Sequence, residues 1–500
     1  MNGLSEKIFL SLKMPAEDMP VSDHRRILLA LEELGYYPVQ IPLAVLQTLY
    51  PLCRNADFDI TVTLVRRESD WVLQQVEAGD TTKCHYGLAV DYGSTTIVME
   101  LVDMNSGKTI DRAKAVNGQV RYGTDILSRI TYAMEDPARK KHLQNATVKT
   151  FDVLLAQLTE ASGIDVSLCP VMVLSGNTTM IHFLLMLDAW PVFASPYAPV
   201  TNDPGFFWGK ELGMGFGGLV YILPAASNYV GGDIISGLLA LNIHKEEKPS
   251  LFFDIGTNGE LVIGNKDWLL AGAGAAGPAL EGYISRFGMR AAPGAVDSVK
   301  IDGRELLFTT IEDKPPVGIC GSGIIDLLAQ MRLHGWMDIA GTLEPAASSR
   351  IRYLPEEQQF AVFYGESLYF TQQDILQFLD TKAAAYTMME CLLETAGIGF
   401  ENLSKVYLSG AFTAHSDLES AITIGIFPDI SRAAYSVRSN TSLEGARLLL
   451  LDRARLQEAK DLAENIYCVQ FASYPDFLVR MQAAKFIPHT DLERFPSVLQ

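Results

Sequence analysis

Residues 88–95 read Leu-Ala-Val-Asp-Tyr-Gly-Ser-Thr, and residues 251–258 repeat this order as Leu-Phe-Phe-Asp-Ile-Gly-Thr-Asn. In both stretches an apolar run ends in an aspartate, and a polar segment containing glycine follows. Another apolar run comes next each time, so each stretch predicts a β-hairpin with a polar tip. Two such hairpins predict a fold that is built twice, with the two matching tips face to face.

The residues of each tip are suited to binding a phosphate. Glycine permits a tight backbone path that exposes successive N–H groups, and hydroxyls add further donors. The candidate phosphate-binding residues are Gly93, Ser94, Thr95 and Thr96 in the first tip and Gly256, Thr257, Asn258 and Gly259 in the second. Asp91 and Asp254 are candidate Mg²⁺ ligands, because Mg²⁺ keeps several waters and needs few carboxylates. A plain hairpin turn is the alternative for either tip alone.

A third motif follows in residues 405–412, where the strand-like Lys-Val-Tyr-Leu runs into Ser-Gly-Ala-Phe. Small residues let a flat adenine and ribose lie against the backbone, so Gly410 and Ala411 are candidate adenosine contacts. The order of the three motifs resembles the superfamily of actin, hexokinase and the 70-kDa chaperones over residues 84–470. This resemblance implies ATP as ligand and an α/β fold: a duplicated actin-like (ribonuclease H-like) ATPase with a small N-terminal α/β domain.

Two segments between the tips carry candidate catalytic residues. Residues 173–180 form a strand that enters a polar turn at Asn177 and Thr178, where this superfamily brings a loop toward the γ-phosphate. Gly231-Gly232-Asp233 comes shortly before the second tip and is similar to the Gly-x-x-Asp of carbohydrate kinases. Asp233 is therefore a candidate to orient a water for in-line attack. Helix N-capping is the alternative for Asn177, Thr178 and Asp233.

Glycine-rich helix starts at residues 275–282 and 318–323 add further candidates for nucleotide contact, namely Gly277, Gly321 and Ser322. Helix N-termini attract anions. Close packing of a helix against a strand is the alternative reason for these glycines.

The length of 500 residues predicts several domains. We expect a small α/β domain over residues 1–83, a first ATPase subdomain over 84–250 and a second over 251–440. Residues 441–500 are expected to form helices that return to the first subdomain.

The formal charge of −19 argues against nucleic acid as a partner, because phosphates attract clustered Lys and Arg. The first residues lack the basic-then-apolar order of a signal peptide, and the apolar runs are interrupted by polar residues. We therefore expect a cytoplasmic protein that does not bind membranes.

The chain resembles the ATP-dependent reductive activators of corrinoid proteins. The motifs that carry this resemblance are Asp-Ile-Gly-Thr-Asn-Gly-Glu (254–260), Ala-Ala-Gly-Pro-Ala (275–279), Gly-Ile-Cys-Gly-Ser-Gly (318–323), Tyr-Gly-Leu-Ala-Val-Asp (86–91), Ser-Gly-Asn-Thr-Thr-Met (175–180) and Gly-Ile-Phe-Pro (425–428). Such proteins return an oxidised Co(II) corrinoid to the Co(I) state that accepts methyl groups. The resemblance implies a corrinoid protein as partner, Mg-ATP as ligand and a homodimer.

The N-terminal ferredoxin-like domain that is usual in this family is absent from the sequence. Six cysteines stand far apart, and no C-x-x-C pattern suggests an iron–sulfur cluster; we expect them to be buried small residues. Either the ferredoxin domain has been removed, or the electron comes from a separate ferredoxin-like protein.

Two other functions fit the same superfamily. A small-metabolite kinase is favoured by the position of Asp233, although no sugar- or acid-binding signature accompanies it. A non-catalytic ATP-sensing scaffold is the other alternative, and the intact Asp and hydroxyl residues of both tips argue against it.

Overall fold

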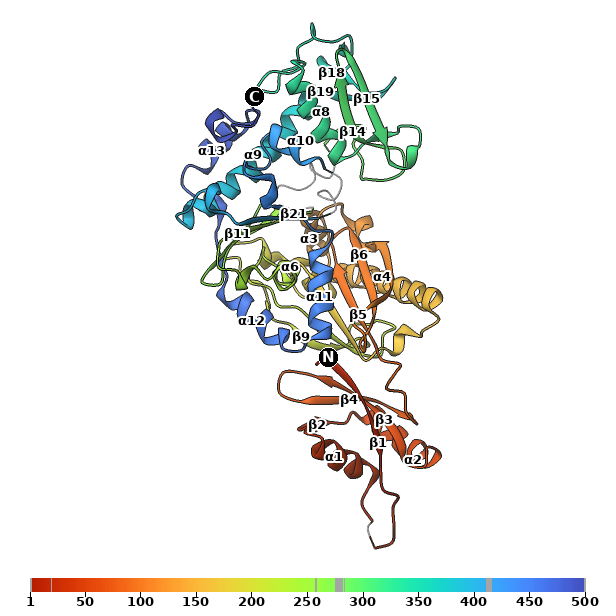
Figure 1. Cartoon of the computed structure of the whole chain (residues 1–500). Helices are drawn as coiled ribbons and strands as arrows, with labels where there is room; N and C mark the ends of the chain where they lie inside the picture. Colours follow the sequence, from red (N-terminus) through yellow and green to blue (C-terminus); the bar gives the residue numbers. More distant parts are fainter. Residues whose placement is uncertain are drawn as a thin grey trace. The chain divides into compact units, whose positions relative to one another are not determined.

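The computed structural model describes residues 2–18, 20–256, 259–274, 282, 284–410 and 416–498. The chain divides into two compact units, one of residues 1–241 with 441–465 and the other of residues 242–440 with 466–500 (Figure 1). This division differs from the expectation that all of residues 441–500 return to the first subdomain. Residues 466–500 instead belong to the second unit, because strand β22 (Tyr467–Cys468) pairs with its sheet and helix α13 (Phe477–Ala484) packs on its long helix.

The N-terminal part of the first unit is a small α/β domain. Its sheet has the order β1-β3-β4-β2, built from β1 (Ser5–Ser11), β3 (Asp59–Arg66), β4 (Trp71–Ala78) and β2 (Val39–Gln40). Helices α1 (Asp23–Glu33) and α2 (Leu43–Asn55) pack on this sheet (Figure 1). The alternating residues Ile60, Val62 and Leu64 are fully buried in the core beneath the helices, as the period of a strand requires.

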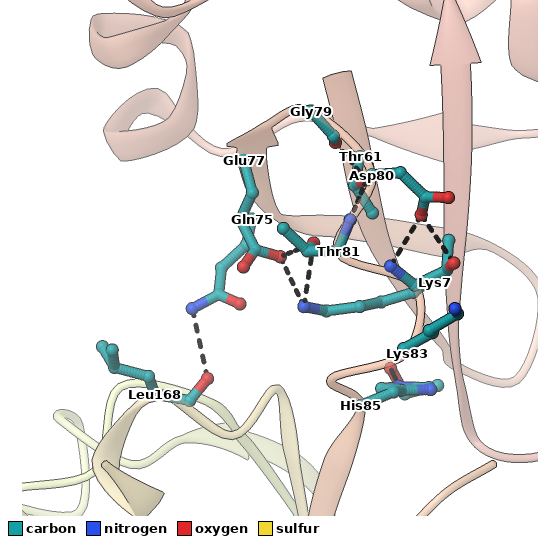
Figure 2. A network of polar contacts seen from close by, with 12 residues as sticks. Lys7, Thr61, Gln75, Glu77, Gly79, Asp80, Thr81, Lys83, His85 and Leu168 are labelled. Atoms are coloured by element: carbon teal, nitrogen blue, oxygen red, sulfur yellow. Dashed lines mark hydrogen bonds and ion pairs between the residues drawn. The ribbon is translucent and has the colours of Figure 1, made fainter. Parts of the chain in front are cut away.

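A network of polar contacts surrounds the connection between β4 and β5, where the small domain joins the rest of the first unit (Figure 2). Lys7 forms an ion pair with Glu77 at 2.5 Å and also donates to the hydroxyl of Thr81. The amide of Gln75 donates to the carbonyl of Leu168 at 3.1 Å, which ties the small domain to the rest of the first unit. His85 lies at the end of the connection and is 4% exposed.

The remainder of the first unit is a six-stranded sheet of the order β7-β6-β5-β8-β10-β9. The strands are β5 (Tyr86–Tyr92), β6 (Thr96–Asp103), β7 (Thr109–Val116), β8 (Val171–Gly176), β9 (Gly205–Trp208) and β10 (Leu219–Ile222). The helices are α3 (Ile126–Glu135), α4 (Ala138–Ser162), α5 (Thr178–Leu184), α6 (Gly232–Leu241), α11 (Thr441–Leu451) and α12 (Arg455–Asn465). Helix α11 lies beside α6 and packs against β5 and β8 (Figure 1).

The second unit contains a sheet of the order β21-β20-β11-β12-β13-β22. Its further strands are β11 (Ser250–Ile255), β12 (Gly259–Gly264), β13 (Leu269–Gly274), β20 (Lys405–Ser409) and β21 (Tyr435–Val437). Two smaller sheets are formed by β14 (Ala295–Asp302), β15 (Glu305–Thr310) and β16 (Gly318–Ile319), and by β17 (Ile351–Leu354), β18 (Gln359–Phe363) and β19 (Tyr369–Thr371). The helices are α8 (Gly321–Leu333), α9 (Gln372–Thr395), α10 (Leu418–Thr423) and α13.

The duplication predicted from the two hairpins is present in the topology. In the first unit, β7, β6 and β5 are antiparallel neighbours, and β8 and then β10 add in parallel beside β5. In the second unit, β13, β12 and β11 are antiparallel neighbours, and β20 and then β21 add in parallel beside β11. The two sheets therefore have the same order and the same strand directions over five strands, which confirms the duplicated actin-like fold.

Among the described residues, no helix combines the length and the apolarity that crossing a membrane requires. Four of the six cysteines are buried, but Cys84 is exposed and Cys468 is partly exposed. The expectation of burial was wrong for Cys84, because it lies in the connection between β4 and β5 and not in a strand or helix.

Candidate functional site

The first tip connects β5 to β6, and three of its carbonyls accept hydrogen bonds from Asn117 and Arg129. The Nδ2 of Asn117 donates to the carbonyl of Gly93 at 3.0 Å, and the Nη1 of Arg129 donates to that of Ser94 at 2.7 Å. The backbone N of Asn117 donates to the carbonyl of Thr95 at 2.8 Å. In a trans peptide the N–H points away from the C=O, so the N–H groups that follow these carbonyls face the opposite side. That side can receive an anion.

Fully buried polar side chains hold the tip in this conformation. Asn117, Gln119 and Arg129 are each 0% exposed. The Nε2 of Gln119 donates to the hydroxyl of Tyr92 at 3.2 Å and to that of Thr147 at 2.8 Å. Burial raises the pKa of Tyr92, so its hydroxyl is neutral. The sequence did not reveal these residues. They come after β7, more than 20 residues beyond the tip, and they belong to no motif that can be recognised on its own.

Asp91 stands at the end of β5, opposite Ser175 in the parallel neighbour β8. The hydroxyl of Ser442, in the first turn of α11, donates to Oδ1 of Asp91 at 2.8 Å. Ser442 also shares a hydrogen bond of 2.9 Å with Ser175, and its carbonyl accepts from the hydroxyl of Ser236 at 2.5 Å. The carboxylate is therefore oriented by a residue that is distant in the sequence, which sequence reasoning also missed.

The candidates Asn177 and Asp233 lie on adjacent turns of the first unit. A Cβ on Gly231 would lie 2.5 Å from Cα of Asn177 and 2.7 Å from Oδ1 of Asp233, so only glycine allows α6 to begin this close to the turn after β8. The side chain of Asn177 caps α5 by accepting from the N of Met180 at 2.9 Å. The capping alternative is thus confirmed for Asn177, whereas Asp233 lies inside the first turn of α6.

The hydroxyl of Thr178 makes a hydrogen bond within the protein. The residue is 3% exposed, and its hydroxyl donates to the carbonyl of Ser227 at 2.9 Å. Its geometry therefore suits support of the turn better than contact with a nucleotide.

The second tip is described in part. Asp254 is the penultimate residue of β11 and lies opposite Ser409 in the parallel strand β20 and opposite Glu260 in β12. Ile255 ends β11, Gly256 follows it directly, and Gly259 begins β12. The candidates Thr257, Asn258, Gly277 and Ala411 lie outside the described residues.

Gly410 lies against the strand that leads into this tip. Its φ is +105°, and a Cβ there would lie 2.0 Å from the carbonyl oxygen of Ile255. A side chain at residue 410 would therefore push β20 away from the end of β11. Gly410 is thus brought to the end of β11, and the adenosine contact of this motif stays a prediction.

The helix start at Gly321 and Ser322 is packed into the second unit. Ser322 is 4% exposed, and its hydroxyl donates to the carbonyl of Asp297 at 2.9 Å. The packing alternative therefore accounts for Ser322.

A second repeated motif emerges from the two sheets. The strand parallel to β5 ends in Leu174-Ser175-Gly176, and the strand parallel to β11 ends in Leu408-Ser409, which Gly410 follows. Each aspartate thus has a serine opposite it in the same register. A search for a second repeat downstream of each Asp-x-Gly would have found this signal.

The first tip and its aspartate fit a polyphosphate with Mg²⁺. The tip carbonyls accept hydrogen bonds from Asn117 and Arg129, so the N–H groups that follow them point away from these donors, toward the side that we assign to the phosphate oxygens. Among the described residues, no cluster of three or more His, Cys, Asp or Glu could hold a metal ion. A Mg²⁺ that is bound through phosphates and water needs only one or two carboxylates, so a single carboxylate at the first tip, that of Asp91, meets this need.

Comparisons with known protein families match three consecutive regions of the chain. Residues 1–83 match the "RACo linker region", residues 86–246 the "RACo middle region", and residues 248–499 the "C-terminal domain of RACo the ASKHA domain". Together these matches cover almost all of the sequence.

Individual proteins are similar over most of the chain. A solved structure named "Reductive activator for corrinoid,iron-sulfur protein" is 34% identical with a TM-score of 0.90, and the match covers 99% of this chain and 81% of that one. The "Corrinoid activation enzyme RamQ" of Eubacterium limosum is 29% identical over 81% of this chain and 71% of that protein. The "[Co(II) methylated amine-specific corrinoid protein] reductase" of Methanosarcina barkeri is 24% identical over 76% of this chain and 73% of that protein.

Proposed function

Because this chain belongs to the RACo family, we propose that it binds Mg-ATP on its two aspartate-led tips and couples ATP hydrolysis to the reduction of a corrinoid protein. The chain is an ATP-dependent reductive activator of corrinoid proteins. The observation that carries this conclusion is the match to a solved reductive activator over 99% of the chain. The equivalent topology of the two hairpins supports the assignment of ATP to the tips.

In the proposed reaction the backbone N–H groups after Gly93, Ser94 and Thr95 bind phosphate oxygens. Asp233 orients a water for in-line attack on the γ-phosphorus, which yields ADP and inorganic phosphate. The water's proton passes to the carboxylate of Asp233 or to bulk solvent. Asn177 places the neighbouring turn through its cap on α5. Mg²⁺, held by Asp91 and Asp254, would neutralise part of the phosphate charge.

The redox half of the reaction adds one electron to Co(II) on the partner and yields Co(I). We propose that a ferredoxin-like iron–sulfur protein supplies the electron. A shift of the partner from 1:99 to 99:1 in favour of its reducible state requires about 5.5 kcal/mol of differential affinity. The protein provides that energy only if its ATP-bound state binds one corrinoid state better than the other.

Three finer features follow from the sequence, which carries no signal-peptide pattern, and from the family resemblance. We propose that the protein acts in the cytoplasm, that it forms a homodimer, and that its partner serves a methyl-transfer pathway.

The test follows Co(I) formation by absorbance with a Co(II) corrinoid protein, a low-potential ferredoxin, ATP and Mg²⁺. Wild-type protein is expected to yield Co(I) only when ATP is present. The variant Asp91→Asn is expected to lose the reaction, and Glu160→Gln, which neutralises an exposed carboxylate on α4, is expected to keep it. Transfer of labelled phosphate from ATP to a small metabolite, without any Co(I), would contradict the proposal in favour of a kinase.

A further inference from the structure

Arg129, in α3, is a fully buried cation that contacts the first tip. Its Nη1 donates to the carbonyl of Ser94 at 2.7 Å, and its Nε donates to that of Gly123 at 2.9 Å. Its Nη2 is buried and has no hydrogen-bond partner in the part of the chain that the structure describes. Within the described residues, no carboxylate forms an ion pair with this guanidinium.

A buried charge without an ion-pair partner lowers the stability of the folded protein, so stability does not explain why Arg129 lies here. A guanidinium does not lose its proton in proteins, so the charge remains although burial lowers the pKa of Arg129. Charged groups are almost never fully buried unless they are paired. The buried Lys382 of the second unit is a useful contrast, because its ammonium donates to three carbonyls, those of Ala484, Phe486 and Pro488, and has an acceptor for each proton. Arg129 keeps a donor without an acceptor.

The position of the charge relates it to the phosphate face of the tip. The carbonyl of Ser94 and the N–H of Thr95 belong to one peptide plane and point in opposite directions. A cation that binds the carbonyl polarises this peptide and makes the N–H a stronger donor, since linked hydrogen bonds strengthen one another. The positive charge therefore lies behind the face that we assign to the nucleotide.

We propose that Arg129 is a positioning residue whose buried charge acts through the Ser94–Thr95 peptide to favour nucleotide phosphates on the first tip. The inference rests on the proposed function, because it takes this tip as the phosphate site. Asp125, which caps α3, attracts the guanidinium without forming an ion pair with it, and the polyphosphate adds a second counter-charge through the peptide.

The test measures equilibrium affinities for ATP, ADP and adenosine. Arg129→Gln keeps a donor for Ser94 but removes the charge, and it is expected to weaken ATP binding about tenfold or more while it changes adenosine binding less than about twofold. Equal weakening of ATP and adenosine, or unchanged ATP affinity, would overturn the inference. Lys382→Gln is the matched control, and it is expected to keep the wild-type ratio of ATP to adenosine affinity. A selective loss of ATP in this control would also overturn the inference.

A second variant gives a readout that a merely structural role would not produce. Arg129→Lys places a titratable cation at the site, and a buried lysine titrates well below its ordinary pKa. ATP affinity of this variant is expected to fall about tenfold as pH rises between about 6 and 10, with adenosine affinity constant. The nearby titratable groups do not interfere. Burial raises the pKa of Tyr92, and although burial alone would raise that of Asp125, hydrogen bonds from Ser128 lower it.

A flat pH profile in Arg129→Lys would overturn the inference even if Arg129→Gln did not fold. Failure of the proposed function has a different signature. In that case the wild-type protein itself would not bind ATP, whereas failure of the inference alone leaves wild-type ATP binding intact.

Discussion

Replacing Gly231 by alanine is expected to separate the catalytic candidates of the first unit. The new Cβ would lie 2.5 Å from Cα of Asn177 and 3.0 Å from the N of Thr178, and both are backbone atoms that cannot rotate away. Relief of this overlap requires a shift of about 1 Å between α6 and the turn after β8. Overpacking of this kind costs about 1–3 kcal/mol of stability, and a 1 Å misplacement near the reacting groups lowers a rate about 100-fold.

The assay combines single-turnover ATP hydrolysis with equilibrium ATP binding. The rate constant of Gly231→Ala is expected to fall about 100-fold, while the dissociation constant for ATP changes less than about threefold, because the first tip does not depend on Gly231. Gly217→Ala is the matched control, since a Cβ there meets only a carbonyl oxygen at 3.5 Å. A folded Gly231→Ala protein that hydrolyses ATP at the wild-type rate would refute the role assigned to Asp233.

Two further predictions concern the support of the first tip and the joint of the small domain. Ser442→Ala removes the donor to Asp91, so the Mg²⁺ concentration that half-saturates ATP hydrolysis is expected to rise about tenfold; an unchanged Mg²⁺ dependence would contradict the role of Ser442. Burial, with a smaller contribution from Lys7, lowers the pKa of His85 from 6.5 to about 4. The unfolded chain then binds the proton first, so the stability due to neutral His85 is complete above pH 6.5 and is lost as pH falls toward 4. Between pH 7 and pH 5 the free energy of unfolding is expected to fall by about 2 kcal/mol because of His85. Urea unfolding of the first unit at the two pH values measures this loss, and the variant His85→Asn is expected to abolish it. Equal losses in the wild-type protein and the variant would contradict the prediction.

The hairpins of the fold could be predicted from sequence because their strands are buried on both faces. Leu88, Ala89 and Val90 are each 0% exposed, as are Leu251 and Phe253, so both runs are continuously apolar. An aspartate at the end of such a run marks the edge of the sheet. These local signals were sufficient for the duplication and for the positions of Asp91 and Asp254 at the ends of β5 and β11.

Other parts of the fold depended on signals that were present but not used. Helix α4 begins with the polar residues 139–142, which conceal its apolar face. Its buried residues follow the spacing of three to four that marks a helix, namely Leu143, Thr147, Phe151, Leu154 and Leu158.

The support of the site could not be predicted, because it depends on long-range contacts. Ser442 reaches Asp91 only after the chain has completed the second sheet and returned through α11. Asn117 and Arg129 can donate to the tip carbonyls only because the chain returns to the tip after β6 and β7. The sequence also suggested a binding role where the structure shows another one. Ser322 is a residue type that suits phosphate binding, but its hydroxyl donates to a carbonyl inside the second unit.

The central claim is that both aspartate-led tips bind the same nucleotide. Calorimetric titration of the wild-type protein with ATP in the presence of Mg²⁺ measures this directly, together with Asp91→Asn and Asp254→Asn. One ATP is expected to bind per chain, and each substitution is expected to weaken that single site about tenfold or more. Two ATP molecules per chain, or unchanged affinity in either variant, would contradict the claim.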